Sequence, residues 1–397
     1  MKALVLRPSD KTVAVEDIPI PAPGSGEVLV HVCAIALNPV DALYSADPIA
    51  TQPRRVVGTD FAGVIVDAAA DLAGSSDERT KPGTRVSGFL QGAASVNDRP
   101  GAFAEFLVIS HDLLWVVHNT LSLEAASAIS MCGLTAAQGL FTRLDLLSPF
   151  EQVESVTPVS SGNGKEVINI FIYGASTSLG LYAAQLVRSS AANSGHSVRL
   201  IGAAGASKHD FLQQGPYWYD ALVAYQDSSW PEQVRAATSD GRGVQYALDC
   251  ISEGMTVAQV HSTFADDVQG DRRFGVFRSP GGGGFETEGL RVQPMYGAVW
   301  EGLGVEVQYN GMVLPANPAA RAFAVSFFAY LSSSERAKLQ PNPLRLMPGG
   351  LERVAPDGFQ LLGSDKVSDR AAREQRTEEW MRPISGEKLV YSLGNLK

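Results

Sequence analysis

Residues 167–186 read VINIFIYGASTSLGLYAAQL, and this stretch decides the fold of the region around it. The nearly continuous apolar run Val167–Tyr173 predicts a central parallel strand that is buried on both faces. Gly174 permits a tight turn after the strand, and Gly180 stands where the next helix must approach the strand closely. Backbone N–H groups between the two glycines would face an anionic group at the helix N-terminus. The stretch therefore predicts a pyrophosphate-binding turn.

The surrounding sequence supports a dinucleotide site, although the usual G-x-G-x-x-G is incomplete because Ala175 and Ser176 occupy its middle. A helix is predicted over Leu179–Ser190 and a second strand over Val198–Gly202. The further strands predicted are Ala221–Tyr225, Val244–Asp249, Phe274–Phe277 and Val305–Tyr309. Strands that alternate with helices in this way are typical of an α/β doubly wound parallel sheet.

The end of the second strand indicates which nicotinamide cofactor is preferred. Sites for NAD usually carry an acidic residue there, which holds the ribose 2′-hydroxyl. Here no acidic residue occurs before Asp210. The side chains that can receive a 2′-phosphate instead are Ser176, Thr177, Ser207 and Lys208, with His209 beside them. The pattern favours NADPH, and the alternative of a helix-capping serine beside a solvated lysine stays open.

The two ends of the chain differ from this central region. Short strand candidates separated by Gly and Pro fill the first 120 residues and predict a small barrel-like domain. Ser122 is expected to cap a helix, and a final strand is expected over Glu387–Leu393. We expect Pro280–Gly284 to be a flexible surface loop, and we assign no role to it or to the charged segment Asp365–Arg382.

Length and composition exclude several classes of protein. The 397 residues exceed what one hydrophobic core usually holds, so two or more domains are expected. A net charge of −10 argues against general binding of nucleic acid. No apolar run is long enough to span a membrane, and the N-terminus lacks the features of a signal peptide, so a cytoplasmic protein is expected. The three cysteines are too far apart in sequence to suggest a disulfide framework or closely spaced metal ligands.

Seven short motifs occur in the order that is typical of one large family. They are Leu37–Asp41, Gly58–Val64, Pro82–Gly88, Gly101–Phe106, Gly133–Ala137, Tyr173–Thr177 and Ser385–Val390. With these motifs, nearly the whole chain resembles a zinc-free medium-chain dehydrogenase/reductase. Within that family it is most similar to the fungal trans-acting enoyl reductases of polyketide synthases, the lovastatin-pathway type. The resemblance implies a GroES-like β-barrel catalytic domain (residues 1–125 and 320–397) and a Rossmann NADPH-binding domain (residues 126–319).

The resemblance also implies which residues form the site. NADPH would be contacted by Pro39, Val40, Asp41, Ala42, Ala175, Ser176, Thr177, Ser178, Ala206, Ser207, Lys208, His209, Tyr225, Phe277, Ser385 and Gly386, in addition to Gly174 and Gly180. An acyl pocket would be lined by Thr135, Ala136, Ala137, Gln138, Gly139, Leu140, Phe141, Thr142, Gln293, Pro294, Met295, Tyr296 and Gly297. A lysine that family members often carry two residues after the Asp of Asn-Pro-x-Asp is Leu43 here, so its role cannot be transferred.

A catalytic metal is not expected. Zinc alcohol dehydrogenases carry a Gly-His-Glu segment that supplies a zinc ligand, and Gly58-Thr59-Asp60 stands in its place. Without a Lewis acid, reduction of a conjugated C=C bond demands less of the protein than reduction of an isolated ketone. Tyr44 is the nearest candidate proton donor, and the alternative is a packed tyrosine with an ordinary hydrogen bond.

Three functions therefore remain open. The first is an NADPH-dependent enoyl reductase that acts in trans on a polyketide chain held by the acyl carrier protein of a partner synthase. The second is a zinc-independent quinone or enone oxidoreductase that acts on free small molecules, and the third is a non-catalytic NADPH-binding protein. The resemblance favours a monomer, whereas related quinone reductases pair through an edge strand, expected here at Val305–Tyr309. Candidate basic contacts for an acidic carrier are Arg54, Arg55, Arg143, Arg272 and Arg273.

Overall fold

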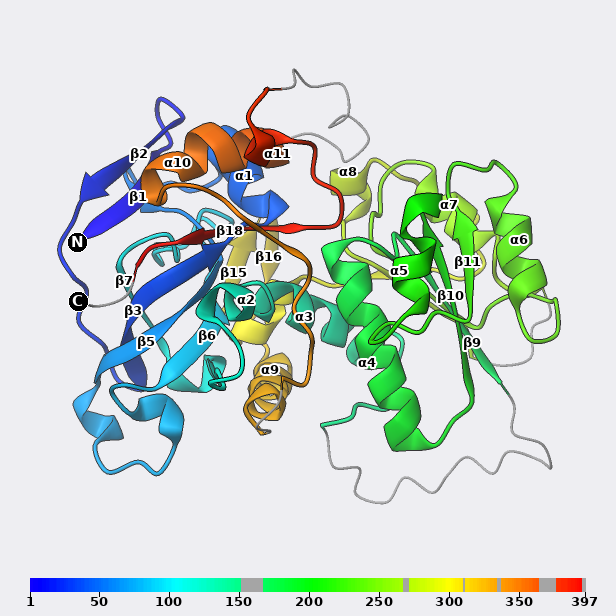
Figure 1. Cartoon of the computed structure of the whole chain (residues 1–397), viewed down its shortest axis with the longest axis horizontal. Helices are drawn as coiled ribbons and strands as arrows, with labels where there is room; N and C mark the ends of the chain where they lie inside the picture. The colour runs from blue at the N-terminus through cyan, green and yellow to red at the C-terminus, as the bar shows by residue number, and fades with distance from the viewer. Residues whose placement is uncertain (151–166, 267–270, 310, 334–336, 364–375, 395–397) are drawn as a thin grey trace. The chain divides into compact units, whose positions relative to one another are not determined.

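The computed structural model of the chain describes residues 1–150, 167–266, 271–309, 311–333, 337–363 and 376–394. The chain forms two compact units (Figure 1). One unit contains residues 1–131 and 300–397, and the other contains residues 132–299. We call them the two-ended unit and the inserted unit, because both ends of the chain build the first and the second is inserted between them.

The two-ended unit is built mainly from antiparallel sheets. Its main sheet has the strand order β17-β18-β3-β5-β6-β8, with β7 also paired to β3, and a smaller sheet has the order β2-β1-β4. The strands are β1 (Lys2–Arg7), β2 (Thr12–Asp17), β3 (Glu27–Ala36), β4 (Arg55–Val56), β5 (Asp60–Ala68), β6 (Arg85–Phe89), β7 (Phe106–Ser110), β8 (Trp115–Val116), β15 (Val307–Tyr309), β16 (Met312–Leu314), β17 (Leu344–Leu346) and β18 (Lys388–Ser392). The helices are α1 (Pro39–Ala46), α2 (Leu123–Ser127), α9 (Pro318–Ser332), α10 (Leu351–Arg353) and α11 (Gln360–Leu362).

Strand β3 organises this unit. Its first half alternates buried and partly exposed residues, and its second half is buried throughout. Such a change is expected where a strand passes from the rim of a sheet to a place covered on both faces. Strand β18, near the C-terminus, runs antiparallel to β3 with Val390 opposite Ala36, and β5 pairs with the other side of β3 (Figure 1). The predicted final strand is thereby confirmed, and it joins the two chain ends in one sheet.

The inserted unit is a six-stranded parallel sheet with the order β11-β10-β9-β12-β13-β14. Its strands are β9 (Ile168–Tyr173), β10 (Val198–Ala204), β11 (Ala221–Ala224), β12 (Tyr246–Asp249), β13 (Arg273–Val276) and β14 (Pro294–Tyr296). Its helices are α4 (Ser178–Ser194), α5 (His209–Gln213), α6 (Trp230–Ala237), α7 (Thr256–His261) and α8 (Pro280–Gly283), and α3 (Ser130–Ala137) begins at the boundary. The predicted α/β class with a doubly wound parallel sheet is confirmed.

Two local predictions are wrong. The sixth strand of the parallel sheet is β14, not the predicted strand at Val305–Tyr309, whose residues from Val307 onward instead form an antiparallel hairpin with β16. The segment Val305–Tyr309 is rich in β-forming side chains, whereas Pro294–Tyr296 begins with a proline, so local preference pointed to the wrong segment. The predicted loop Pro280–Gly284 begins with the short helix α8, because the Ser279 hydroxyl accepts from Gly282 N–H and Gly284 ends the helix in a left-handed conformation.

Strand β9 is central in the inserted sheet, and helix α4 lies beside it and β10 (Figure 1). The strand is buried along nearly its whole length, as its apolar sequence predicted. The Phe171 ring stacks on Trp230 of α6 with ring centroids 5.6 Å apart, so α6 also packs against the sheet. Helix α4 begins after Thr177, whose hydroxyl accepts from Gly180 N–H. This rigid strand–turn–helix unit positions the predicted pyrophosphate turn.

Candidate active site

The turn between β9 and α4 has the geometry that the sequence predicts. Gly174 has a φ of +74°, a left-handed conformation that a residue with a side chain adopts only with strain. Thr177 closes the turn, because its backbone N–H and its hydroxyl both donate to the Gly174 carbonyl, at 2.9 and 2.7 Å. A Cβ at Gly180 would lie 2.4 Å from that carbonyl oxygen. The close approach of helix and strand therefore requires glycine, and it leaves a cradle of backbone N–H groups at the start of α4.

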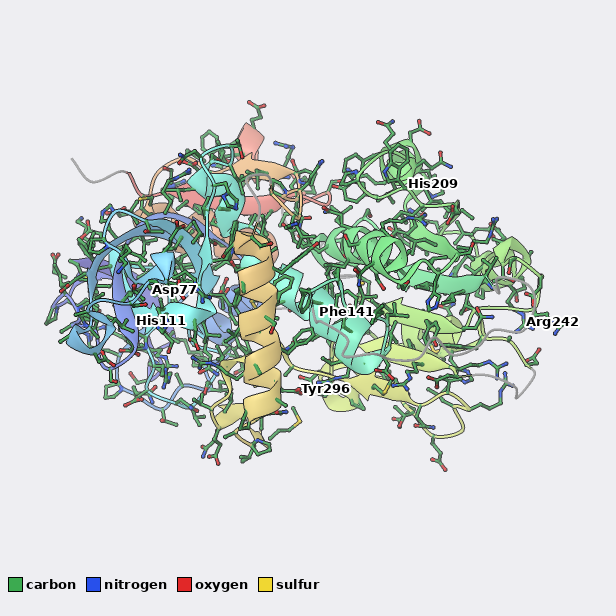
Figure 2. The ribbon with its side chains drawn as sticks, turned by 90° about the horizontal axis from the view of Figure 1, so that it is seen from below. Asp77, His111, Phe141, His209, Arg242 and Tyr296 are labelled. Carbon is green, nitrogen blue, oxygen red and sulfur yellow. The ribbon has the colours of Figure 1, made fainter. Side chains whose placement is uncertain are left out.

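The end of β10 carries the residues predicted for the 2′-phosphate. Ala206–Lys208 form one short helical turn after Ala204, and α5 begins at His209. The ring Nε2 of His209 lies 3.4 Å from the Ala204 carbonyl oxygen, so the ring folds back on the end of the strand. His209 lies well away from Phe141 and Tyr296, which belong to the predicted acyl segments (Figure 2). The residues predicted for the 2′-phosphate and those predicted for the acyl group therefore lie in different parts of the inserted unit.

Sequence reasoning missed a neighbour of this site, Gln226. A Cβ placed at Gly205 would lie 3.6 Å from Gln226 Nε2 and 3.8 Å from the Tyr225 ring, so both side chains face the loop after β10. Both are exposed, and Tyr225 is 49% exposed despite its ring. The signal that was available was the strand order. A residue at the carboxyl end of β11 lies beside the carboxyl end of β10, because the two strands pair in parallel.

A second missed group lies at the end of β12. Both backbone N–H groups of Ile251 and Ser252 donate to the buried Asp249 carboxylate, at 2.9 and 2.8 Å, and the Thr256 hydroxyl donates to it at 2.6 Å. Burial raises the pKa of Asp249, and these hydrogen bonds oppose the rise. Phe277 N–H donates to the Ser252 hydroxyl at 3.0 Å. Asp249 therefore shapes a turn that fixes the backbone of the predicted cofactor contact Phe277.

The predicted acyl segments meet in part within the inserted unit. One small cavity is lined by Thr135, Gln138, Gly139, Arg143, Gly275, Val276, Phe277 and Gly297. A Cβ at Gly139 would lie 2.7 Å from the Phe277 ring, and one at Gly297 would lie 2.5 Å from the Arg143 guanidinium. The cavity is about 10 Å³, which is room for one water molecule. The structure thus brings four predicted acyl residues beside Phe277, but in a closed pocket.

Other predicted acyl residues lie elsewhere in the same unit. Leu140 is fully buried, and the Phe141 ring packs edge-on against Phe150. The exposed Gln293 directs its amide back to the carbonyl oxygen of Leu290. The residues from Gln138 to Arg143 form a π-helical turn, an irregular form that is frequent at functional sites. No pattern in the sequence marks this turn.

In the two-ended unit, the Asn-Pro-Val-Asp motif is held by a buried polar network. Asn38 N–H donates to Asp41 Oδ2 at 2.7 Å, and the Thr59 hydroxyl donates to the same oxygen at 3.2 Å. Asn38 Nδ2 donates to Thr59 Oγ1 and to Asp60 Oδ2, each at 2.8 Å. Lys388 Nζ donates to Asn38 Oδ1 at 2.5 Å and lies 3.1 Å from Asp60 Oδ2. We call these five residues the Lys388 cluster.

All members of the Lys388 cluster are buried, and they include two carboxylates and one ammonium. Burial raises the pKa of the Asp41 carboxyl to about 7, and the charge of Asp60 adds to the rise. Lys388 and the hydrogen bonds from Asn38 and Thr59 act in the opposite direction. Asp41 was predicted as a cofactor contact, but its connection with Lys388 could not be predicted because 347 positions separate the two residues.

The remaining predicted residues of this unit differ in accessibility. Tyr44, the candidate proton donor, is only 5% exposed. Pro39 and Ser385 are exposed, and Gly386, two residues before β18, has a φ of +74°. Among the arginines suggested as carrier contacts, the prediction for Arg55 is wrong. Its side chain is 2% exposed and donates to the Gly92 carbonyl oxygen at 2.9 Å.

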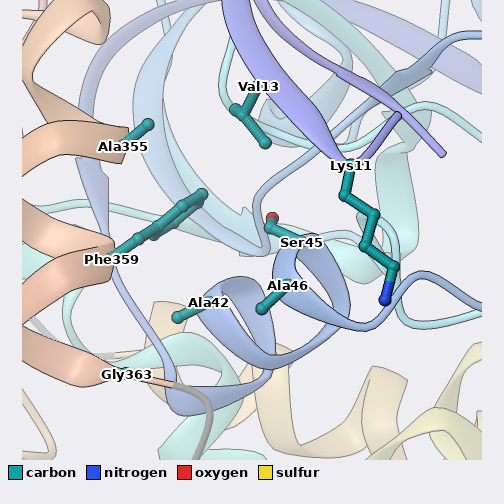
Figure 3. A pocket seen from close by; sticks show the side chains of 8 residues that line it. All are labelled: Lys11, Val13, Ala42, Ser45, Ala46, Ala355, Phe359 and Gly363. Carbon is teal, nitrogen blue, oxygen red and sulfur yellow. The ribbon is translucent and has the colours of Figure 1, made fainter. Parts of the chain in front are cut away.

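The face of α1 that carries Ala42, Ser45 and Ala46 borders an open pocket of about 350 Å³ (Figure 3). The other lining residues are Lys11, Val13, Ala355, Phe359 and Gly363, and the Phe359 ring points into the pocket. The Ser45 hydroxyl already donates to the Asp41 carbonyl at 2.6 Å. Among the described residues, no cluster of three or more His, Cys, Asp or Glu side chains is arranged to hold a metal ion.

Comparison with known proteins identifies the family. Residues 24–119 match the alcohol dehydrogenase GroES-like domain. The chain is 30% identical over 382 residues to the trans-enoyl reductase gkaC of Penicillium citrinum, and the match covers 94% of this chain and 92% of gkaC. This chain belongs to the trans-enoyl reductases. It is therefore an oxidoreductase that acts on a carbon–carbon double bond, and the resemblance noted in the sequence is confirmed.

Solved structures agree with this trans-enoyl reductase fold. The CurK enoyl reductase aligns with a TM-score of 0.68 at 16% identity and covers 98% of both chains. The mycobacterial protein Rv1454c, solved in complex with NADPH, aligns with a TM-score of 0.59 at 18% identity and covers 99% of this chain and all of its own. Within the described residues, no helix is both long and apolar enough to cross a membrane.

Proposed function

We propose that this trans-enoyl reductase uses NADPH to reduce the α,β-double bond of an acyl thioester that a partner polyketide synthase holds on its acyl carrier protein. The inserted unit would be the NADPH-binding domain and the two-ended unit the catalytic domain. Membership of the family supports the reaction, and the name of the relatives, trans-enoyl reductase, supports action on a chain held by another protein. The product would be a saturated acyl chain for a secondary metabolite.

The proposal that the cofactor is NADPH depends on the residues that follow the carboxyl ends of β9 and β10. The turn at Gly174–Gly180 supports a pyrophosphate site, because glycine at position 180 lets α4 begin directly against the end of β9, where an added Cβ would lie 2.4 Å from the Gly174 carbonyl oxygen, and the N-terminus of a helix favours an anion. At the end of β10, Lys208 stands near the place where an NAD site has an acid. A charge pair near 4 Å is worth about 1–4 kcal/mol at the surface of a protein. Lys208 therefore favours a 2′-phosphate over a 2′-hydroxyl.

NADPH, when bound, supplies the hydride. The residues of this chain would bind and orient it. The Gly174–Ser178 turn would hold the pyrophosphate, and the backbone at Phe277, fixed through Ser252 and Asp249, would lie against the nicotinamide end. The pocket lined by Thr135 and Gln138 would have to widen to admit the acyl thioester, and these two side chains would then contribute polar groups beside it. Because hydride transfer to a conjugated alkene places charge on the thioester oxygen, such donors lower the barrier by stabilising that charge.

The test uses purified protein with NADPH or NADH and three substrates: an α,β-unsaturated acyl thioester of a small thiol, the same acyl group on an acyl carrier protein, and a simple enone. We expect oxidation of NADPH with both thioesters, a higher kcat/KM with the carrier-bound one, and little turnover of the enone. Absence of turnover with both thioesters would refute the proposal. Fast turnover of the enone alone would instead identify an oxidoreductase of free small molecules.

A further inference from the structure

We infer that Lys388 is a positioning residue, whose ammonium group holds Asn38 and thereby the turn at Pro39–Ala42 that would contact the cofactor. The inference deepens the proposed function and rests on it, because the turn matters for catalysis only if a nicotinamide cofactor lies against it. It starts from the order of three strands, β18-β3-β5, in the main sheet.

The strand register brings the cluster together. Val390 lies opposite Ala36, and Leu37 N–H donates to the Leu389 carbonyl, so Lys388 comes to lie beside Asn38 just beyond the end of β3. On the other side of β3, Ala36 lies opposite Asp60, the first residue of β5. Three segments far apart in sequence therefore place an ammonium, an amide and a carboxylate in one row across the sheet.

Both the carbonyl oxygen and the amide nitrogen of the Asn38 side chain form hydrogen bonds within the Lys388 cluster. Its carbonyl oxygen accepts from Lys388, and its amide donates to Thr59 and Asp60. The Asn38 backbone in turn binds the Asp41 carboxylate, which closes the first turn of α1. The Asn38 side chain is thus fixed from three directions, and the start of α1 is fixed with it.

The network also reaches the beginning of α3. Met131 N–H donates to Asp60 Oδ1 at 2.9 Å, while the other oxygen of the same carboxylate receives Asn38 and Lys388. Gly386, which the family resemblance places at the cofactor, stands two residues before Lys388 on the same chain segment. Lys388 therefore links three of the chain segments that are predicted to form the site.

Stability alone does not account for such a cluster. Removing a carboxylate and an ammonium from water costs several kcal/mol for each ion, and an apolar pair of similar volume is often at least as stable. A buried ion pair fixes geometry more strictly than an apolar pair, because its hydrogen bonds have defined directions.

The experiment compares three variants of the full chain by thermal unfolding and by NADPH titration with fluorescence detection. Lys388→Met removes the ammonium, and the double variant Asp60→Asn/Lys388→Met removes both charges. Arg55→Met is the matched control, because Arg55 is also a buried cation of the two-ended unit and binds Gly92 and Gln52 instead of the cluster.

We expect Lys388→Met to lower the Tm and to raise the Kd for NADPH at least tenfold. The double variant should regain part of the Tm, because the buried charge of Asp60 is removed together with that of Lys388, yet keep the tenfold higher Kd. Arg55→Met should lower the Tm and leave the Kd within twofold of the unaltered protein. If the double variant binds NADPH within twofold of the unaltered protein, the positioning role is wrong while the proposed function stands. If the unaltered protein binds neither NADPH nor NADH, the proposed function itself fails.

Discussion

The carboxyl group of Asp41 makes the stability of this enzyme depend on pH near neutrality. Its ordinary pKa is 3.8, and burial raises it to about 7 in the folded protein. The folded state therefore binds a proton more tightly than the unfolded state between these two values. The stabilising contribution is fully present below about pH 4 and is lost as the pH rises through about 7. Replacement of Asp41 by asparagine should remove this dependence.

The size of the effect follows from the shift. Each pKa unit corresponds to about 1.4 kcal/mol, so the full contribution has an upper limit of about 4 kcal/mol. Between pH 5 and pH 7 the free energy of unfolding of the unaltered protein should fall by about 2–3 kcal/mol relative to Asp41→Asn. Asparagine suits the site, because its carbonyl oxygen can accept from both Asn38 N–H and the Thr59 hydroxyl.

Urea unfolding at pH 5, 6, 7 and 8, followed by circular dichroism, measures the difference between the two proteins. Because the chain has two units, the comparison uses the transition that Asp41→Asn shifts, and the slope with urea must stay the same in both proteins. The charged groups that face Asp41 are Asp60 and Lys388, and both are retained in the variant. Parallel pH profiles for the two proteins would show that Asp41 is ionised throughout and would refute the reasoning.

Three further predictions concern the proposed site. Gly180→Ala should lower the Tm and abolish NADPH binding in a fluorescence titration, because the new Cβ would lie 2.4 Å from the Gly174 carbonyl oxygen. Retained binding would contradict this prediction and show that α4 can move away from the turn. Lys208→Ala should raise the KM for NADPH about tenfold or more and leave the KM for NADH nearly unchanged, and an equal rise in both would show that Lys208 does not meet the 2′-phosphate. Tyr44→Phe should leave kcat within threefold, because Tyr44 is 5% exposed; a loss of a hundredfold or more would identify it as the proton donor.

The parallel sheet could be predicted because its determinants are local. An apolar run, a glycine in a tight turn and a capped helix lie within the 20 residues from Val167 to Leu186, and each restricts the backbone independently of the rest of the chain. Ser122 is a second example, since its hydroxyl accepts from Ala125 N–H as the pattern predicted. The prediction of the sheet's edge strand failed because local preference favoured Val305–Tyr309 over the segment Pro294–Tyr296. Only pairing across the sheet decides that β14, and not β15, forms its edge.

In the candidate site, too, local features could be predicted from the sequence, and features that depend on distant segments could not. Gly174 has the tight-turn geometry that its own short segment predicts, whereas the sequence did not predict that Thr177 closes this turn and caps α4. Gln226 and Asp249 were missed because their importance comes from the neighbouring strand and from a turn that only burial makes significant. A carboxylate is ordinarily solvated, and nothing within the sequence around Asp249 shows that it is buried.

The Lys388 cluster shows that a family motif can be recognised in the sequence without revealing the contacts that its residues make in the fold. Asn38, Asp60 and Lys388 each occur in a motif that signals the family, and each motif was recognised on its own. Their connection depends on β18 returning beside β3 after more than 300 intervening residues, which is a property of the sheet and not of any segment. Once that register is known, the motifs no longer need separate explanations. A buried ammonium requires a carboxylate nearby, the carboxylate and the ammonium together orient one amide, and that amide fixes the start of α1.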